Sequence, residues 1–195
     1  MKGILFIDFL LSKVVKGEKT MTRRTGGLKG INSETHLKID HWFEVMRVDS
    51  WSDYVDSILR DKFKKKKGIH FVFFGNAIAA VVKPRYQPGE IVYLKESCGR
   101  VSGIMFYRVD YPEGHKMRTD FKGWGNKLFM KAENARFKVQ ITDVRVERAN
   151  DITEEDSIKE GCANKAEFET IWMKINGISS WKKNPYVFVY SFKRV

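Results

Sequence analysis

The segment from Gly17 to Arg24 reads G-E-K-T-M-T-R-R and places three cationic side chains and two hydroxyls within six residues. The side chains concerned are Lys19, Thr20, Thr22, Arg23 and Arg24. The two guanidinium groups match phosphate oxygens, the ammonium is a mobile donor, and the hydroxyls can donate or accept. This composition suits a site for a phosphate or a polarised carbonyl. It also fits a solvated loop, because basic residues after a helix complement the negative end of its dipole.

A short helix is expected directly before this segment. Apolar residues recur at helical spacing after Asp8, which we interpret as the N-cap, and Gly17 is well placed to end the helix. The apolar positions are Phe9, Leu10, Val14 and Val15. We therefore expect Lys19 to Arg24 to open a loop.

The length and composition indicate one folded domain. The chain has 195 residues, of which 43% are hydrophobic, and an insertion is expected at about residues 35–83. No apolar run is long enough to span a bilayer and the first residues do not resemble a signal peptide, which favours a cytoplasmic location without membrane contact. Cys98 and Cys162 are interpreted as free thiols, and no metal or cofactor is expected. His36, His41, His70 and His115 lack metal-ligand spacing and are expected at the surface.

The charge favours a polyanionic partner. The formal net charge is +12 and the isoelectric point is near 9.6, which would attract RNA, DNA or nucleotides. Part of the excess lies in Lys62 and in the run from Lys64 to Lys67. That run is interpreted as a solvated loop, with a nucleic-acid contact as the alternative.

Several strands are predicted from alternation and turn signals. Residues 71–82 suggest a strand pair broken at Gly75-Asn76, and the turn at residues 84–90 leads into a strand at residues 91–96. Residues 137–146 alternate with a change of phase, which predicts one long curved strand with a bulge near Thr142-Asp143. Residues 186–192 form a last buried strand.

Two helices are predicted between the long strand and the last one. Thr153 to Asp156 resembles a capping box that starts a helix ending at Gly161. A second helix, with an apolar stripe, ends at Gly177. The stripe consists of Phe168, Ile171, Trp172 and Ile175. Together these elements predict an α+β, barrel-like domain.

Five motifs in this order resemble an ASCH domain. They are the G-x-K-T-x-T-R-R segment, the Y-x-P-G-E turn with a V-Y-L-K-E strand, the I-T-D-V-R-V-E-R strand, the I-T-E-E-D-x-x-x-E-G helix and the W-x-x-N-P-Y-V-F-V-Y-S-F strand. The chain is similar to the longer members carried in phage and prophage genomes. The resemblance covers nearly the whole chain in pieces, with residues 35–83 as its least typical part. The resemblance implies a PUA-like mixed β-barrel with flanking helices, a fold widely used to bind RNA, with the ligand cleft lined by the basic motif.

A smaller bacterial branch of ASCH proteins hydrolyses 4-acetylcytidine, and its catalytic Lys, Thr and Glu match Lys19, Thr22 and Glu160. This chain is about twice as long, and it has Arg-Arg where those enzymes have an apolar residue followed by Arg. In such a mechanism Lys19 would take the proton of Thr22, whose oxygen would attack an amide carbonyl, and Glu160 would protonate the leaving amine. The alternative is a Lys19–Glu160 salt bridge that closes the barrel mouth.

Further residues are candidates for ligand contact. Thr20, Arg23 and Arg24 belong to the basic motif, and Lys95 and Glu96 leave a predicted strand, on which neighbouring side chains point to opposite faces. At most one of this last pair should therefore reach the cleft. Aromatic residues before Ala132 could stack a base or pack in the core. They are Trp124 and Phe129, followed by Met130.

The sequence thus favours a protein that binds RNA or a nucleoside or nucleotide through the segment Lys19 to Arg24. Hydrolysis of an N-acylated cytidine-type nucleoside is the second interpretation, and a phage structural or interaction protein is the third. A closed pocket would fit a nucleoside, and an open basic groove would fit a strand.

Overall fold

The computed structural model describes residues 1–33, 44–54, 56–75, 79–111, 115–117 and 119–195. His36, His41 and Asn76, which enter the expectations above, lie outside these ranges.

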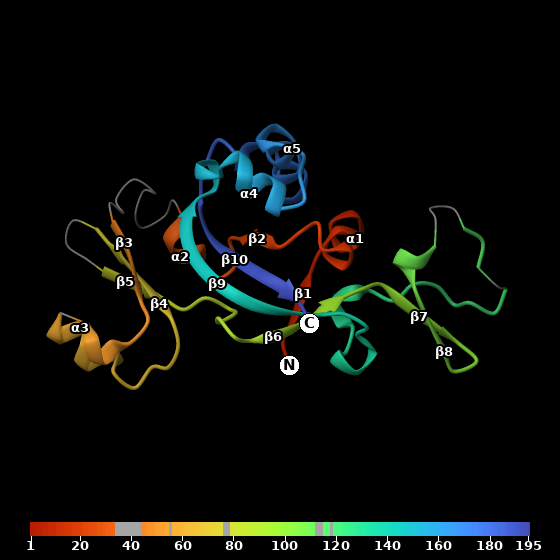
Figure 1. The fold of residues 1–195 in the computed structure, drawn as a ribbon, viewed down its shortest axis with the longest axis horizontal. Helices are drawn as coiled ribbons and strands as arrows, with labels where there is room; N and C mark the ends of the chain where they lie inside the picture. Colours follow the sequence, from red (N-terminus) through yellow and green to blue (C-terminus); the bar gives the residue numbers. More distant parts are fainter. Residues whose placement is uncertain (34–43, 55, 76–78, 112–114, 118) are drawn as a thin grey trace.

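A curved five-stranded sheet forms the centre of the molecule (Figure 1). Its strands, in spatial order, are β1 (Gly3–Leu5), β6 (Ile91–Lys95), β9 (Lys138–Arg148), β10 (Tyr186–Arg194) and β2 (Met21–Arg24). β1 pairs with β6 in parallel, and the other pairs are antiparallel. No ladder joins β1 to β2 in the described part of the chain, so both are edge strands. The α+β class is confirmed, whereas the described strands form no closed barrel.

The long strand β9 contains the expected irregularity. Ser191 of β10 pairs with Asp143 and Phe192 pairs with Ile141, which leaves Thr142 as the extra residue of a bulge. Val139, Ile141 and Val144 are all buried. The extra residue shifts the alternation of side chains by one position, so Val144 points into the core like Val139 and Ile141. The prediction of a bulge near Thr142-Asp143 is confirmed.

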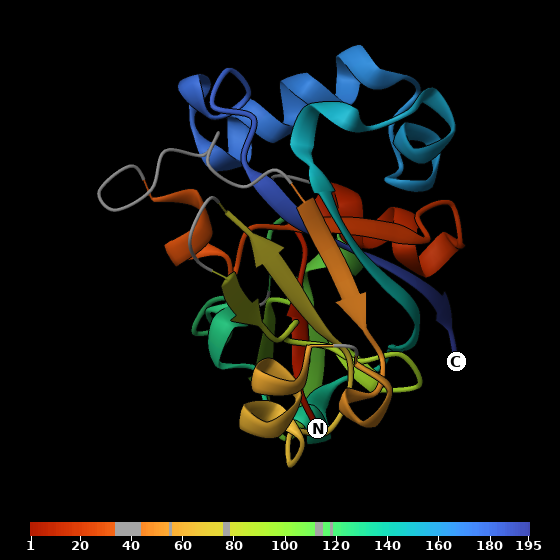
Figure 2. The ribbon, with the colours of Figure 1, turned by 90° about the vertical axis from the view of Figure 1, so that its left-hand side faces the viewer.

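A second sheet is built from residues 44–82 and packs against the first (Figure 2). It contains β3 (Glu44–Val48), β4 (His70–Phe74) and β5 (Ala79–Val82), with helix α3 (Ser57–Phe63) between its first two strands. On its inner face, the ring centroid of Phe71 lies 5.7 Å from that of Phe188, and the centroid of Phe73 lies 5.1 Å from that of Tyr186. β4 and β5 are antiparallel neighbours, which confirms the predicted strand pair, and one face of this sheet completes the main core.

A third, two-stranded sheet projects from the body as an arm (Figure 1). It consists of β7 (Cys98–Val101) and β8 (Ile104–Tyr107). Aromatic side chains that follow β8 pack on one another, and the rings of Phe121 and Trp124 meet edge to face at 4.7 Å.

Helices cover both faces of the central sheet. They are α1 (Asp8–Lys16), α2 (Lys29–Asn32), α4 (Glu154–Lys159) and α5 (Lys165–Asn176), and short 3-10 turns lie at residues 51–53, 108–110, 127–129, 132–134, 149–151 and 178–180. α1 packs on the face that carries Tyr190, and α5 packs on the face that carries Val189. The free edge of β2 therefore runs between these two helices.

Most of the helix ends lie where the sequence predicts them. Gly17 adopts a left-handed conformation with φ 80° at the end of α1, and the Thr153 hydroxyl accepts a hydrogen bond from the Asp156 amide at the start of α4. Gly177 ends α5. Asp8 is not the N-cap, because it is the first helical residue and Ile7 precedes it without a side-chain cap. Its carboxylate instead lies in the first turn, where it complements the helix dipole.

Among the described residues, no helix combines the length and the apolar character that crossing a bilayer requires.

Candidate functional site

The basic motif forms a strand and not the expected loop. Met21–Arg24 is β2, in which Thr22 pairs with Tyr190 and Arg23 with Val189 of β10. Basic residues and threonines give only a weak local signal for a strand, and the partner strand lies more than 160 positions later. Pairing with this distant buried strand therefore overrides the local preference.

Strand geometry divides the motif between the two faces of the sheet. Thr22 and Arg24 share the face that α1 covers, whereas Met21 and Arg23 point to the face that α5 covers. Because β2 is an edge strand, a ligand at its free edge can touch side chains from both faces. A loop would not have separated the two arginines in this way.

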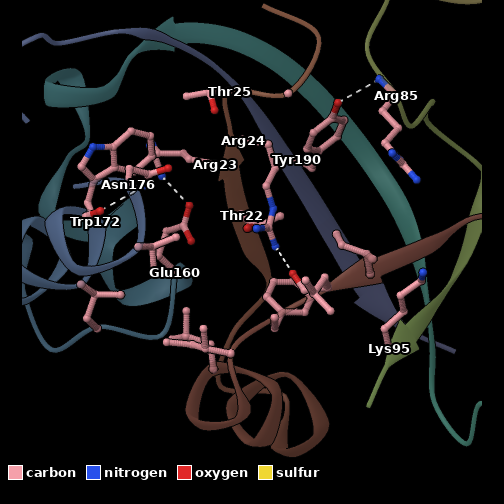
Figure 3. Close-up of a pocket in the computed structure, with 18 of the residues that line it drawn as sticks. Thr22, Arg23, Arg24, Thr25, Arg85, Lys95, Glu160, Trp172, Asn176 and Tyr190 are labelled. Atoms are coloured by element: carbon pink, nitrogen blue, oxygen red, sulfur yellow. Dashed lines mark hydrogen bonds and ion pairs between the residues drawn. The ribbon is translucent and has the colours of Figure 1, made fainter. Parts of the chain in front are cut away.

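A cavity of about 440 Å³ lies at this edge (Figure 3). Its lining includes β1 residues Gly3–Leu5 on one side, residues 22–26 on the other, and α5 residues such as Trp172 and Asn176. The cavity therefore occupies the gap between β1 and β2 that a closed barrel would fill with a ladder.

Lys19 and Glu160 meet deep beside this cavity. The Lys19 Nζ donates to the Glu160 carboxylate at 2.5 Å and to the Glu160 backbone carbonyl at 2.6 Å. Both side chains are almost fully buried, with 1% and 5% of their surface exposed. Lys19 also caps α4, whose last carbonyls carry the negative end of the dipole. The structure thus has the salt bridge of the alternative interpretation.

Burial lowers the pKa of Lys19, and the nearby Arg24 acts in the same direction. Glu160 opposes this shift because its charge stabilises the ammonium. The Lys19 ammonium does not belong to the cavity lining, whereas Glu160 and Thr22 do. A proton transfer from Thr22 would therefore require Lys19 to exchange a bond with Glu160.

Arg23 is held by three carboxylates. It donates to Asp156 at 2.8 Å, to the second Glu160 oxygen at 3.2 Å and to Glu147. Arg145 joins the same network, because it lies level with Arg23 across β10 and also contacts Glu147 and Asp156. These carboxylates raise the pKa of Arg23 against the opposing effect of its burial. Arg23 is thus neutralised by the protein itself.

Arg24 has no such partner among the described residues. Its guanidinium donates to the Leu5 carbonyl at 2.5 Å and lies 5.0 Å from the centroid of the Phe6 ring. Burial lowers its pKa, and the charge of Glu160 has the largest effect in the opposite direction. It stays protonated at neutral pH, as arginines in proteins do. Figure 3 shows it between Glu160 on one side of the cavity and Lys95 on the other.

The two threonines of the motif have different surroundings. Thr22 is 4% exposed, lines the cavity, and makes no side-chain hydrogen bond within the described part of the chain. Thr20 has an exposed side chain and does not line the cavity, although its backbone bonds to Lys159 and Phe192. Thr22 therefore offers a free hydroxyl to a ligand, whereas Thr20 serves the sheet.

Lys95 and Glu96 point to opposite sides, as expected for strand neighbours. Lys95 lines the cavity and donates to the Leu128 carbonyl at 2.5 Å. Glu96 is fully buried elsewhere and pairs with Arg136 at 2.6 Å. The expectation that at most one of the two reaches the cleft is confirmed, and Glu96 is not a ligand contact in this structure.

Several cavity residues were not anticipated from the sequence. Arg85 and Tyr86 come from the turn before β6, Tyr190 comes from β10, and Asn176 comes from the end of α5. The turn and the last strand were recognised only as structural elements. The α5 residues that face the cavity could have been found from the apolar stripe of this helix. All four residues of the stripe line the cavity, namely Phe168, Ile171, Trp172 and Ile175.

Other candidates lie away from the cavity. His70 is buried, with 4% exposed, and accompanies Trp51, so the expectation of a surface position was wrong for this histidine. His70 is the first residue of β4, whose following residues are hydrophobic and buried, and it is therefore buried with them in the second sheet. His115 is exposed, as are Lys62 and the run Lys64 to Lys67.

The aromatic residues before Ala132 do not share one environment. Trp124 is half-buried in the arm, Phe129 is 81% exposed, and Met130 is buried against the sheet. Cys98 and Cys162 are free thiols. No group of His, Cys, Asp and Glu in the described ranges could hold a metal ion.

Comparison of the chain with protein-family models, with curated proteins and with solved structures found no match.

Proposed function

We propose that this protein binds RNA or a nucleotide in the cavity between β1 and β2, as a PUA-like ASCH domain would. The observation that carries the proposal is the contrast between two adjacent arginines. Arg23 is neutralised by carboxylates, whereas Arg24 presents an unpaired guanidinium to the cavity. Arg24 is half-buried, and a cation partly withdrawn from water without a counter-ion is costly, so an anionic ligand would supply the missing charge.

The cavity walls suit the rest of a nucleotide. Aromatic side chains from both faces of the sheet line it, together with the Thr22 hydroxyl and the Asn176 amide. The aromatic residues are Phe6, Tyr86, Phe168, Trp172 and Tyr190. Apolar walls with a few polar groups are typical of small-molecule sites, in which the polar groups fix the orientation of the ligand.

The size of the cavity favours a single nucleotide over a length of strand. Its volume of about 440 Å³ lies within the usual range for small-ligand pockets, roughly 300–1,000 Å³. An RNA chain would therefore place one nucleotide in the cavity while the rest remains outside. The exposed lysines at residues 64–67 contribute to the charge that attracts such a chain.

A second candidate function is hydrolysis of an N-acylated cytidine-type nucleoside. It is favoured by the buried Lys19 with its lowered pKa, the contact of Lys19 with Glu160, and the free Thr22 hydroxyl in the same cavity. In this mechanism Thr22 would form the bond to the carbonyl carbon after Lys19 takes its proton. For this, the Lys19 ammonium would first pass a proton to Glu160, which leaves a neutral amine to take the Thr22 proton and a carboxylic acid to protonate the leaving amine. Water would then hydrolyse the acyl-Thr22 ester and release the free acid.

Binding and turnover assays with one panel of compounds test both candidates. The panel contains cytidine, 4-acetylcytidine, a cytidine monophosphate and a short single-stranded RNA, and the readouts are calorimetric binding and release of cytidine. Binding without turnover supports the first function. If no compound binds at low salt, the proposal that this cavity holds a nucleotide is wrong.

Thr22→Val separates the two functions at one residue. If Thr22 is the nucleophile, the variant loses nearly all turnover and keeps its affinity within a few-fold, because one neutral hydrogen bond is worth about 0.5–1.5 kcal/mol. Lys19→Arg should also be inactive, since a guanidinium cannot accept the proton. Retained turnover in Lys19→Arg would exclude the mechanism.

A further inference from the structure

We infer that the ligand presents a phosphomonoester, the terminal phosphate of a nucleotide, to the side of the cavity formed by Arg24, Lys95 and Arg85. This inference rests on the proposed function and adds to it the chemical nature of the anionic end. It follows from the balance of charge inside the cavity and from the side on which the unpaired charge lies.

The cavity carries an excess of positive charge that the protein does not compensate. Its lining contains five basic side chains and one acidic side chain. Arg23 is already paired with carboxylates, and Lys127 is paired with Asp8 at 3.0 Å. The other three, Arg24, Arg85 and Lys95, form no ion pair with a described residue. Three positive charges are therefore left for a ligand.

The unpaired positive charges of the cavity lie apart from Glu160, its one acidic side chain. In Figure 3, Glu160 stands with Arg23 and Trp172 on one side of the cavity, and Lys95 and Arg85 stand on the other, with Arg24 between them. Because Lys19 and Arg23 already compensate Glu160, the anionic end of a ligand would find no free positive charge beside it and would be attracted to the opposite side. This polarity directs the phosphate toward Lys95 and Arg85, and the uncharged nucleoside toward Trp172.

Hydrogen-bonding capacity remains on the same side. Arg24 uses one N–H for the Leu5 carbonyl, and Lys95 uses one of its three for the Leu128 carbonyl. Arg85 has no side-chain bond to a carboxylate, and its guanidinium lies 5.6 Å from the centroid of the Tyr86 ring. The remaining N–H groups can reach several phosphate oxygens, and guanidinium groups match those oxygens in pairs.

The number of charges distinguishes a phosphomonoester from a phosphodiester. A monoester carries about −1.5 to −2 charges at neutral pH and has three terminal oxygens. A diester carries one negative charge and has two such oxygens. Three unpaired cations are balanced better by the monoester, so the cavity should prefer a free nucleotide or the phosphorylated end of a strand over an internal nucleotide.

The test compares ligands that differ only at this group. Calorimetry would measure the unmodified protein with cytidine, with cytidine 5′-monophosphate and with its 5′-methyl phosphodiester, at one salt concentration. We expect the monophosphate to bind about 10- to 100-fold more tightly than cytidine, as one or more charged hydrogen bonds would provide, and clearly more tightly than the diester. Short RNAs with a 5′-phosphate or a 5′-hydroxyl then distinguish a strand end from a free nucleotide.

Single substitutions test which side chains cause the preference for the monophosphate. Arg24→Gln should abolish most of the difference between monophosphate and cytidine while leaving cytidine binding within a few-fold. Lys95→Gln and Arg85→Gln should each reduce the same difference, and they test the inference if Arg24→Gln does not fold. Arg85 is exposed, so its replacement should not disturb the fold. Arg100→Gln removes one exposed positive charge from the arm, outside the cavity, and should change nothing beyond a weak general effect.

The possible results separate this inference from the proposed function. If cytidine binds as tightly as its monophosphate, or the diester as tightly as the monoester, the phosphomonoester inference is wrong and nucleotide binding stands. If Arg100→Gln weakens monophosphate binding as much as Arg24→Gln, diffuse charge holds the phosphate and the inference also fails. Absence of binding by all three compounds would overturn both.

Discussion

Lys19 contacts Glu160 twice, once at the carboxylate at 2.5 Å and once at the backbone carbonyl at 2.6 Å, although 141 positions separate the two residues. The double contact fixes the end of α4 against Lys19, which lies two residues before β2. Because Glu160 also accepts a bond from Arg23 with its other oxygen, both of its oxygens are engaged by cations. One buried carboxylate thereby orients two of the three basic residues of the motif.

Replacement of Glu160 should strongly destabilise the protein. Glu160→Gln leaves the Lys19 ammonium buried without its counter-ion, and removal of one partner from a buried pair costs about 3–5 kcal/mol. Urea denaturation would measure the loss. Glu155→Gln is the matched control, because Glu155 pairs with Lys159 on the surface of the same helix with 77% of its side chain exposed. That change should have almost no effect, and equal losses for both variants would contradict a special role for the buried pair.

The lowered pKa of Lys19 predicts the direction of a pH effect. Between that lowered pKa and the ordinary value of 10.5, the unfolded chain keeps the proton and the folded protein does not. The unfolded state therefore binds more protons, and the free energy of unfolding contributed by this residue rises with pH. The stability of the unmodified protein relative to Lys19→Met should therefore increase as the pH rises from the lowered pKa toward the ordinary value of 10.5. A difference that decreases over this window would show that the Glu160 charge outweighs burial.

The two adjacent arginines should differ in their effect on stability. Arg23→Leu deprives Glu147, Asp156 and Glu160 of their shared cation and should cost roughly 3 kcal/mol, the low end for a buried pair, because Lys19 and Arg145 still contact these carboxylates. Arg24→Leu removes the bond to the Leu5 carbonyl, worth about 0.5–1.5 kcal/mol, but it also removes a charge without a counter-ion, so its net cost should be well below that of Arg23→Leu. Thermal unfolding of both variants checks this order, and a reversed order would mean that Arg24 is the structural residue.

A glycine next to the buried pair should be harder to replace than an isolated one. Gly161 has φ +82°, and a Cβ there would lie 3.2 Å from the Lys19 Cβ and 3.1 Å from the Lys13 Cδ. Gly17, at the end of α1, has φ +80° with no atom within 4 Å. Both alanine variants pay for the left-handed backbone, roughly 1–2 kcal/mol. Gly161→Ala should lose more in denaturation experiments because Lys19 must also move, and similar losses would indicate that the end of α4 adjusts freely.

Cys162 should resist alkylation. Burial raises the pKa of this thiol to about 11, so only on the order of one molecule in a thousand holds the reactive thiolate at pH 8. Burial also raises the pKa of Cys98, but this thiol is partly exposed. Mass spectrometry after timed treatment with iodoacetamide should find Cys98 labelled well before Cys162. Equal rates would mean that the cavity wall opens often enough to expose Cys162.

Elements with strong local signals were predictable from the sequence. The turn before β6, the two C-terminal helices and the bulge at Thr142 each depend on neighbouring residues: prolines and glycines, a capping threonine, or a change in alternation. The approach of Lys19 to Glu160 could be expected only from the family resemblance, because no periodicity links such distant positions.

The site could not be completed from the sequence, because its parts depend on pairing across the sheet. Arg23 meets Arg145 and Glu147 through the register of three strands, and no local pattern determines that register. The same pairing turns the expected loop into β2. Alternation along β6 shows that only one of Lys95 and Glu96 can point into the cavity. It does not show which one, because that depends on which face of the strand is turned toward the cavity.

The partnership of β2 with β10 also affects how the protein is made. β2 contains residues 21–24 and its partner residues are 188–191, so synthesis must reach residue 191 before the two strands can pair in full. Contacts this distant close slowly, because the entropy of a long loop is lost before any pairing energy is gained. The cavity is therefore a late product of folding, and a nascent chain on the ribosome cannot yet hold a ligand in it.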